Sequence, residues 1–303
     1  MIPLQGTPEW VAWRNGGVGA SEMGVPLGED PYRSEYELAL LKRGEIEPEP
    51  MNEAMAWGHR VQRLALVAYA ESTGQRVRNV NTTTVSKTHP HVYASLDGRV
   101  VGERKGVEVK LTRAWDEPPR RVVLQCQVQM AVCDLDVIDV VRVGLGYQAP
   151  TVYPIERDES LGTALLELAE GWYLRYVVGD EMPPMDGSRG ASRHLDKHRG
   201  EDEADATEYQ AELLHKLHAA RQTAATADED ERRIINLLKE SMAGTGVLRA
   251  PGARVTWAPV KGRVTTDWKA VAAEVGYGPD VAERHTRAGE PTTRFAVKYE
   301  EET

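Results

Sequence analysis

Asp97, Glu108 and Lys110 are the residues of this chain whose types and spacing could do chemistry. The segment 107–110 reads V-E-V-K, and alternate side chains of a β-strand point to the same face. If this segment is a strand, Glu108 and Lys110 share one face and the two valines lie on the other. Asp97 precedes a glycine in a turn and can approach the same face. The pattern predicts two carboxylates and one ammonium group around one point.

Such a cluster suits the hydrolysis of a phosphate ester with the help of a divalent metal. Carboxylate oxygens are the ligands that Mg²⁺ prefers. A bound Mg²⁺ polarises a phosphoryl oxygen and lowers the pKa of a bound water. A neighbouring lysine can orient that water or help to deprotonate it. The plainer alternative is a surface Glu–Lys pair beside a turn, which the spacing alone leaves open.

The elements that must position these residues are helices mixed with strands. Helical signals run over residues 35–43, 52–72, 121–133 and 160–178. Extended signals run over residues 76–80, 82–86, 92–95, 99–101, 106–111, 137–143 and 151–155. The nearly continuous apolar run at 137–143 is typical of a buried central strand. We therefore predict an α/β or α+β fold with a mixed central sheet flanked by helices.

Three parts of the chain differ in composition. Residues 1–186 carry the predicted core, and residues 187–205 are charged, poor in apolar side chains and predicted to be a linker. Residues 206–243 contain no proline or glycine and repeat apolar side chains at helical spacing, which predicts one long helix or a helical hairpin. Small strands and a short helix at 267–275 are expected in the remainder up to residue 303.

Composition bounds the class of protein. The 303 residues include 37 Lys and Arg against 47 Asp and Glu, a formal net charge of −10. This acidic balance argues against a protein that coats nucleic acid over its whole surface, but it allows a locally basic channel. No membrane-length apolar run and no secretory signal pattern is present, so a cytoplasmic protein is expected. Cys126 and Cys133 are expected to be free thiols.

Short motifs surround the three chemical residues in a fixed order. They are Arg14 with G-V-G-A-S-E at 17–22, D-P-Y at 30–32, S-E-Y-E-L at 34–38, M-A-W-G at 55–58, S-L-D-G at 95–98, E-V-K at 108–110 and Q-V-Q at 127–129. This series resembles the lambda-exonuclease and YqaJ-like viral recombinase family of the P-D…E-x-K nuclease superfamily. The resemblance implies a restriction-endonuclease-like nuclease core over residues 14 to about 179.

Two positions depart from the family pattern. Leu96 replaces the proline that precedes the aspartate, which leaves the ligands intact because proline only shapes the backbone. Gln62 stands where the family helix carries a glutamate, and an amide offers an oxygen but no charge. Beside Asp97 and Glu108, the resemblance makes Gln62 and its neighbour His59 candidate metal ligands. A displaced alignment of this helix is the alternative.

Five further residues are candidates for catalysis or DNA contact. Arg14 and Ser21 match the family positions that hold a DNA 5′-phosphate, and a guanidinium is a planar two-pronged donor to phosphate. Ser21 lies in a turn that opens a helix, where it could also be a plain cap. Gln127 is expected to reach the metal site or the attacking water, with a solvent-facing position as the alternative. Arg113 and Arg120 belong to a basic stretch expected to follow DNA.

The residues and the resemblance together predict a metal-dependent DNA exonuclease of the phage recombination type. Its cofactor would be Mg²⁺, with Mn²⁺ as an alternative. Only the resemblance implies 5′-to-3′ digestion from double-stranded DNA ends, a single-strand annealing protein as partner and a homo-oligomer in the form of a trimer. Two alternatives remain: an endonuclease with the same core acting in defence, and a degenerate core that binds DNA or a partner without cleaving.

Overall fold

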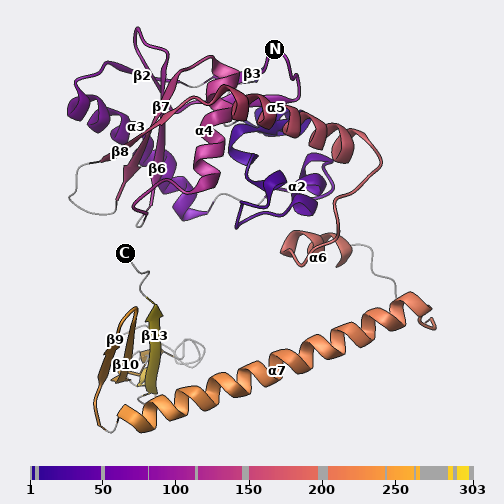
Figure 1. The fold of residues 1–303 in the computed structure, drawn as a ribbon, viewed down its shortest axis with the longest axis vertical. Helices are drawn as coiled ribbons and strands as arrows, with labels where there is room; N and C mark the ends of the chain where they lie inside the picture. The colour runs from indigo at the N-terminus through magenta and orange to yellow at the C-terminus, as the bar shows by residue number, and fades with distance from the viewer. Residues whose placement is uncertain are drawn as a thin grey trace, which may run out of the picture. The chain divides into compact units, whose positions relative to one another are not determined.

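The computed structural model describes residues 2–3, 7–48, 52–80, 82–112, 115–144, 150–196, 204–242, 244–262, 264–266, 286–288 and 292–299. The chain forms two compact units, Met1–Glu201 and Asp202–Thr303. Figure 1 shows the helices and strands of each unit. Among the described helices, none combines the length and apolar character that a membrane-spanning helix needs.

A five-stranded mixed sheet forms the centre of the first unit. Its strand order is β2-β5-β6-β7-β8. The strands are β2 (Val77–Asn79), β5 (Gly98–Val100), β6 (Lys105–Leu111), β7 (Val137–Val143) and β8 (Thr151–Glu156). β6 runs parallel to β7, with Glu108 opposite Val140, and the other neighbours are antiparallel. The predicted α/β fold class with a mixed central sheet is confirmed.

Two helices cover opposite faces of this sheet (Figure 1). On α3 (Glu53–Thr73), Leu66 and Tyr69 pack against Val107 of β6. On α4 (Arg120–Cys133), Cys126 and Met130 pack against the other face, where β7 places its alternate residues. β6 therefore lies between two helices, and each of its faces is directed at one of them.

A smaller sheet and three further helices complete the first unit. β1 (Val18–Gly19), β4 (Val92–Ser95) and β3 (Thr83–Val85) pair in the order β1-β4-β3, and β1 is parallel to β4. The helices are α1 (Pro8–Trp13), α2 (Glu35–Lys42) and α5 (Glu159–Tyr173). The side chain of Ser34 caps α2 by accepting a hydrogen bond from the Glu37 amide, as the sequence predicts.

Part of the predicted linker is helical. Within residues 187–205, Arg189–Asp196 form α6, and its buried Ala191 packs with Tyr36 and Leu40. The charged sequence gives no apolar helical pattern here, because the helix contacts α2 through one small buried alanine. Cys126 is buried, Cys133 is half-buried, and both are free thiols.

The second unit joins a long helix to a small sheet. α7 (Glu208–Met242) is a single helix of 35 residues, so the hairpin alternative is wrong. β9 (Val247–Ala250), β10 (Ala253–Val260) and β13 (Thr292–Tyr299) form an antiparallel sheet in the order β13-β10-β9. β11 (Val264–Thr266) pairs with β12 (Thr286–Ala288). The helix expected at 267–275 lies outside the described residues.

Gly17 offers a test of how the small sheet is held to the chain before it. The Val18 amide donates to the His91 carbonyl oxygen over 2.7 Å, and a Cβ on Gly17 would clash with that same oxygen. We expect Gly17→Ala to lower the free energy of unfolding by about 1–3 kcal/mol in urea denaturation. Gly16→Ala is the control, because a Cβ there would meet nothing within 4 Å. Equal stability of the two variants would contradict this packing.

Candidate active site

Asp97, Glu108 and Lys110 come together on one face of β6 and form what we call the carboxylate cluster. Glu108 and Lys110 project toward α4, while Val107 packs toward α3. The Lys110 ammonium lies 2.8 Å from Glu108 Oε1. Asp97 precedes β5, and its Oδ2 accepts a hydrogen bond of 2.7 Å from the Val109 amide. The alternation along β6 thus directs one carboxylate and one ammonium toward the turn that carries the other carboxylate.

Two glutamines of α4 fix the Glu108 carboxylate. Gln125 Nε2 donates to Oε1 of Glu108 over 2.8 Å, and Gln129 Nε2 donates to Oε2 over 2.7 Å. Gln125 also accepts a hydrogen bond of 2.9 Å from Lys110. Both glutamines are buried, and residues four apart share one face of a helix. Each oxygen of Glu108 therefore has a fixed hydrogen-bond donor.

Gln127 does not reach the cluster, so its predicted role is wrong. Its Nε2 donates to the Glu156 carbonyl oxygen, and its Oε1 accepts from the Asp158 amide. Residues 125, 127 and 129 are all glutamines, and the middle one lies about 200° around the helix from its neighbours, on the opposite side. Gln127 therefore anchors α4 to the chain before α5.

Gln62 of α3 reaches Asp97, and His59 takes no part in the hydrogen bonds described for the cluster. Gln62 Nε2 donates to Asp97 Oδ1 over 2.7 Å. Gly98 permits this approach, because a Cβ there would lie 2.8 Å from Leu66 Cδ2 on α3. His59 lies one turn earlier on α3 with an exposed side chain.

The surroundings of Asp97 change the pKa of its carboxyl group. Burial raises the pKa of Asp97, and the Glu108 carboxylate raises it further. The Val109 amide and the Lys110 ammonium lower it, but the pKa remains raised, to about 8. Burial would lower the pKa of Lys110, but Glu108 outweighs it and the pKa is raised. Lys110 therefore keeps its charge, and the cluster with both carboxylates ionised has a net charge of −1.

This donor set fits a hard divalent cation that keeps part of its water. Mg²⁺ is commonly held by one or two carboxylates together with waters. A cation beside Asp97 and Glu108 would relieve the repulsion that raises the pKa of Asp97. The amide oxygen of Gln62 could join them if the side chain turned over. Among the described residues, no group of three or more His, Cys, Asp or Glu side chains is arranged to hold a metal.

A second charge cluster lies around Glu22, which is buried. Its carboxylate forms ion pairs with the Lys42 ammonium at 2.7 Å and the Arg14 guanidinium at 3.3 Å. It also accepts a hydrogen bond of 2.8 Å from the Gly19 amide. Burial would raise the pKa of Glu22, but Lys42 and Arg14 outweigh it and lower the pKa to about 2. Arg14 also donates to the Tyr93 hydroxyl over 3.2 Å. With both cations protonated the cluster has a net charge of +1, and burial lowers the pKa of Lys42.

The other predicted DNA-contact residues lie in different settings. Ser21 is exposed in a single 3₁₀ turn, Ala20–Glu22, so no long helix begins there. Arg14 keeps 30% of its side chain exposed. Arg120 begins α4, is 72% exposed and lies 3.3 Å from Glu29. Arg113 lies outside the described residues.

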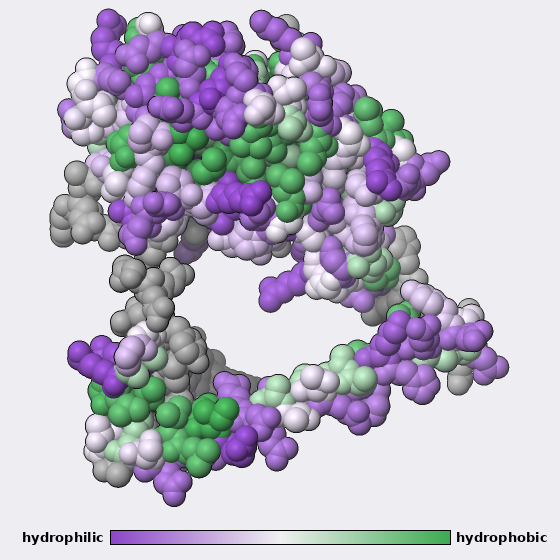
Figure 2. Space-filling model, in the orientation of Figure 1, coloured by the Kyte–Doolittle hydropathy of each residue, from purple (hydrophilic) through white to green (hydrophobic). Residues whose placement is uncertain are grey.

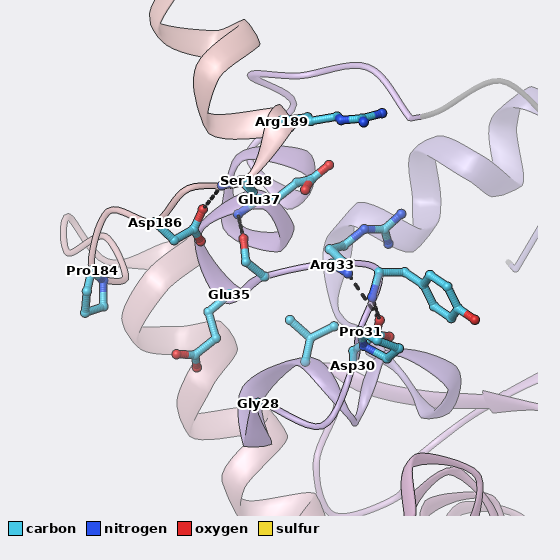
Figure 3. Close-up of a pocket in the computed structure, with 13 residues that line it drawn as sticks. Gly28, Asp30, Pro31, Arg33, Glu35, Glu37, Pro184, Asp186, Ser188 and Arg189 are labelled. Carbon is cyan, nitrogen blue, oxygen red and sulfur yellow. Dashed lines mark hydrogen bonds between the residues drawn. The ribbon is translucent and has the colours of Figure 1, made fainter. Parts of the chain in front are cut away.

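A pocket of about 860 Å³ opens between the loop before α2 and the segment before α6. Figure 3 shows Arg33, Pro184 and Arg189 among the side chains that line it. No residue of the carboxylate cluster belongs to its lining. The carboxylate cluster therefore lies outside this pocket, at the central sheet that α3 and α4 cover from opposite faces.

Known proteins resemble this chain in sequence. Residues 9–136 match the model of the YqaJ-like viral recombinase domain. "Uncharacterized protein YqaJ" of Bacillus subtilis (strain 168) is 23% identical over 265 residues, which cover 83% of this chain and 83% of that protein. These matches confirm the resemblance to the YqaJ-like viral recombinase family.

Two solved structures with similar chains are those of an exonuclease. An alkaline exonuclease, LHK-Exo, from Laribacter hongkongensis is 23% identical, with a TM-score of 0.46 over 73% of this chain and 100% of that chain. LHK-Exo in complex with dAMP is 26% identical, with a TM-score of 0.49 over 56% of this chain and 92% of that chain.

The raised pKa of Asp97 predicts a pH-dependent stability. The unfolded aspartate releases its proton near pH 3.8 and the folded one near pH 8, so between these values the folded state binds more protons. Stability should therefore fall as pH rises through this window. Without divalent metal, we expect the Tm of the wild type to fall by several degrees as pH rises through this window, relative to the Tm of Asp97→Asn. A difference in Tm that does not change with pH would contradict the assigned ionisation.

Proposed function

We propose that this chain is a divalent-metal-dependent DNA exonuclease. The observation that carries the proposal is the carboxylate cluster, in which Asp97 and Glu108 are held beside a lysine whose pKa is raised. The match to the YqaJ-like viral recombinase domain supports a nuclease role for the unit that contains it. Phosphodiester hydrolysis uses this combination of groups.

The side chains in and around the carboxylate cluster have different roles in this reaction. Mg²⁺, when bound beside Asp97 and Glu108, supplies a Lewis acid and lowers the pKa of a water molecule. Gln125 and Gln129 hold Glu108 in one orientation, so its oxygens need little reorganisation. Because the pKa of Lys110 is raised, its ammonium acts as a donor that orients water and stabilises negative charge on the phosphate, rather than as a base.

The Glu22 cluster supports entry of a 5′-phosphorylated end. Arg14 and Lys42 together outweigh the charge of Glu22, and Arg14 is the partly exposed member of the pair. Glu22 holds the guanidinium in place, so a phosphate would meet a preorganised donor beside the exposed Ser21. We propose 5′-to-3′ digestion of duplex ends, which the family resemblance implies and this cluster supports. The resemblance alone leads us to propose phage-type recombination and an annealing protein as partner.

Replacing the members of the carboxylate cluster tests the catalytic assignment. We expect Glu108→Gln and Lys110→Met each to reduce nucleotide release from 5′-labelled linear duplex by more than about 100-fold with Mg²⁺. EDTA should abolish the wild-type reaction. Gln127→Ala is the matched control on α4 and should retain most of the activity. Near wild-type rates for either cluster variant would overturn its role.

End selectivity tests the 5′-phosphate assignment. Arg14→Gln should slow digestion of 5′-phosphorylated duplex by at least about tenfold and digestion of 5′-hydroxyl duplex far less, since a charged hydrogen bond to the phosphate is lost. The ratio of the two rates is insensitive to partial loss of folded protein. Closed circular duplex is the control and should resist the wild type. Equal losses on both ends would refute the assignment, and cleavage of the circle would indicate an endonuclease.

A further inference from the structure

α7 presents a row of side chains, all exposed except the half-buried Leu238, that repeats at alternating steps of four and three residues. The row consists of Leu213, Leu217, Ala220, Ala224, Ala227, Glu231, Ile234 and Leu238. Leu213 and Leu217 are each 45% exposed, and Ile234 is 52% exposed. This spacing is the a/d repeat of a coiled coil, in which such a row packs against another helix. Figure 2 shows hydrophobic and hydrophilic side chains together on the surface of α7.

Contacts within the second unit involve the carboxyl end of α7. Met242 is the one buried side chain of the helix, and the Lys239 ammonium lies 5.9 Å from the Trp257 ring centre on β10. Met242 and Lys239 are not members of the a/d row. Apart from the half-buried Leu238, the row therefore stays exposed along the described part of this unit.

The a/d row is complementary to its own reverse. When the helix is turned end for end about the midpoint between residues 225 and 226, Leu213 meets Leu238 and Leu217 meets Ile234. Ala224 meets Ala227 at the centre, where small side chains allow close approach. Every pair joins an a position to a d position, which is the register of an antiparallel coiled coil.

Charges on the flanks of the row favour the same arrangement. The reversal brings Arg221 of one copy beside Asp228 of the other, with Asp230 at the same level on the other flank. In a parallel pair Arg221 would instead face Lys216, the preceding flanking position of the partner, which carries the same charge. Like charges in these positions destabilise a coiled coil and opposite charges set its orientation.

We propose that α7 binds a second copy of this chain as an antiparallel two-helix coiled coil. With 35 residues, the helix provides a seam about 52 Å long. The occupant of the row is the same sequence in reverse direction, with leucine and isoleucine contacts toward both ends, Ala220 against Glu231 inside them, and alanines in the middle. The proposal does not depend on the chemistry of the first unit. If the first units form their own ring, α7 joins such rings in pairs.

A charge-reversal pair tests the proposal on the full chain. Arg221→Glu places an acid beside Asp228 of the second copy, with Asp230 at the same level, and the double variant Asp228→Arg/Asp230→Arg places basic residues at the level of Arg221. Each protein alone should show half the wild-type mass in light scattering at equal concentration. Mixing the two should restore the full mass, because every reversed charge then meets its opposite.

The control and the orientation test complete the experiment. Arg232→Glu changes an exposed residue outside the row and its flanks, and should keep the wild-type mass. Leu213→Cys and Leu238→Cys, oxidised, should form a disulfide-linked dimer when mixed and none separately, with the wild type as background for Cys126 and Cys133. Unchanged masses for both charge variants would overturn the proposal. Crosslinking of each cysteine variant with itself would overturn the antiparallel arrangement.

Discussion

The repulsion between the Asp97 and Glu108 carboxylates is the constraint around which the first unit is built. Burial raises the pKa of Asp97, and the Glu108 carboxylate, which the one ammonium of Lys110 also faces, raises it further, to about 8. Several elements hold the carboxylates together in spite of this: the Val109 amide and Gln62 bind Asp97, and two glutamines bind Glu108. α3 and α4 supply these amides from opposite faces of β6. The local structure is therefore consistent with a site that requires a cation.

The first unit contains the opposite imbalance as well. Around Glu22, Arg14 and Lys42 give an excess of positive charge in a buried setting. An excess of negative charge attracts a metal cation, and an excess of positive charge attracts a phosphate. β4 carries Tyr93, whose hydroxyl accepts hydrogen bonds from Arg14 and Lys42, and it leads through Asp97 into β5, so this stretch of chain touches both clusters. An enzyme that holds the end of a DNA strand while hydrolysing it uses both.

Strand periodicity predicted the cluster well because a period of two leaves no ambiguity about faces. The shared face of Glu108 and Lys110 followed from it directly, whereas Asp97 was placed beside them from its turn and the family resemblance supported the set. Helical phase was harder: three glutamines at every second position of α4 make two opposite faces look alike, and Gln127 was assigned to the wrong one. Gln129 and Gln125 could have been found by asking which pair lies four residues apart. α6 was missed because its single buried alanine carries no periodic signal.

Direct metal binding tests the central claim, that the carboxylate cluster holds a divalent cation. Mn²⁺ would be titrated into the wild type and Glu108→Gln above about pH 8, where Asp97 is ionised, with electron paramagnetic resonance reporting free Mn²⁺. The account predicts saturable binding by the wild type that Glu108→Gln weakens by at least about tenfold, because a charged ligand is lost. Equal binding by both proteins, or none by the wild type, would contradict it.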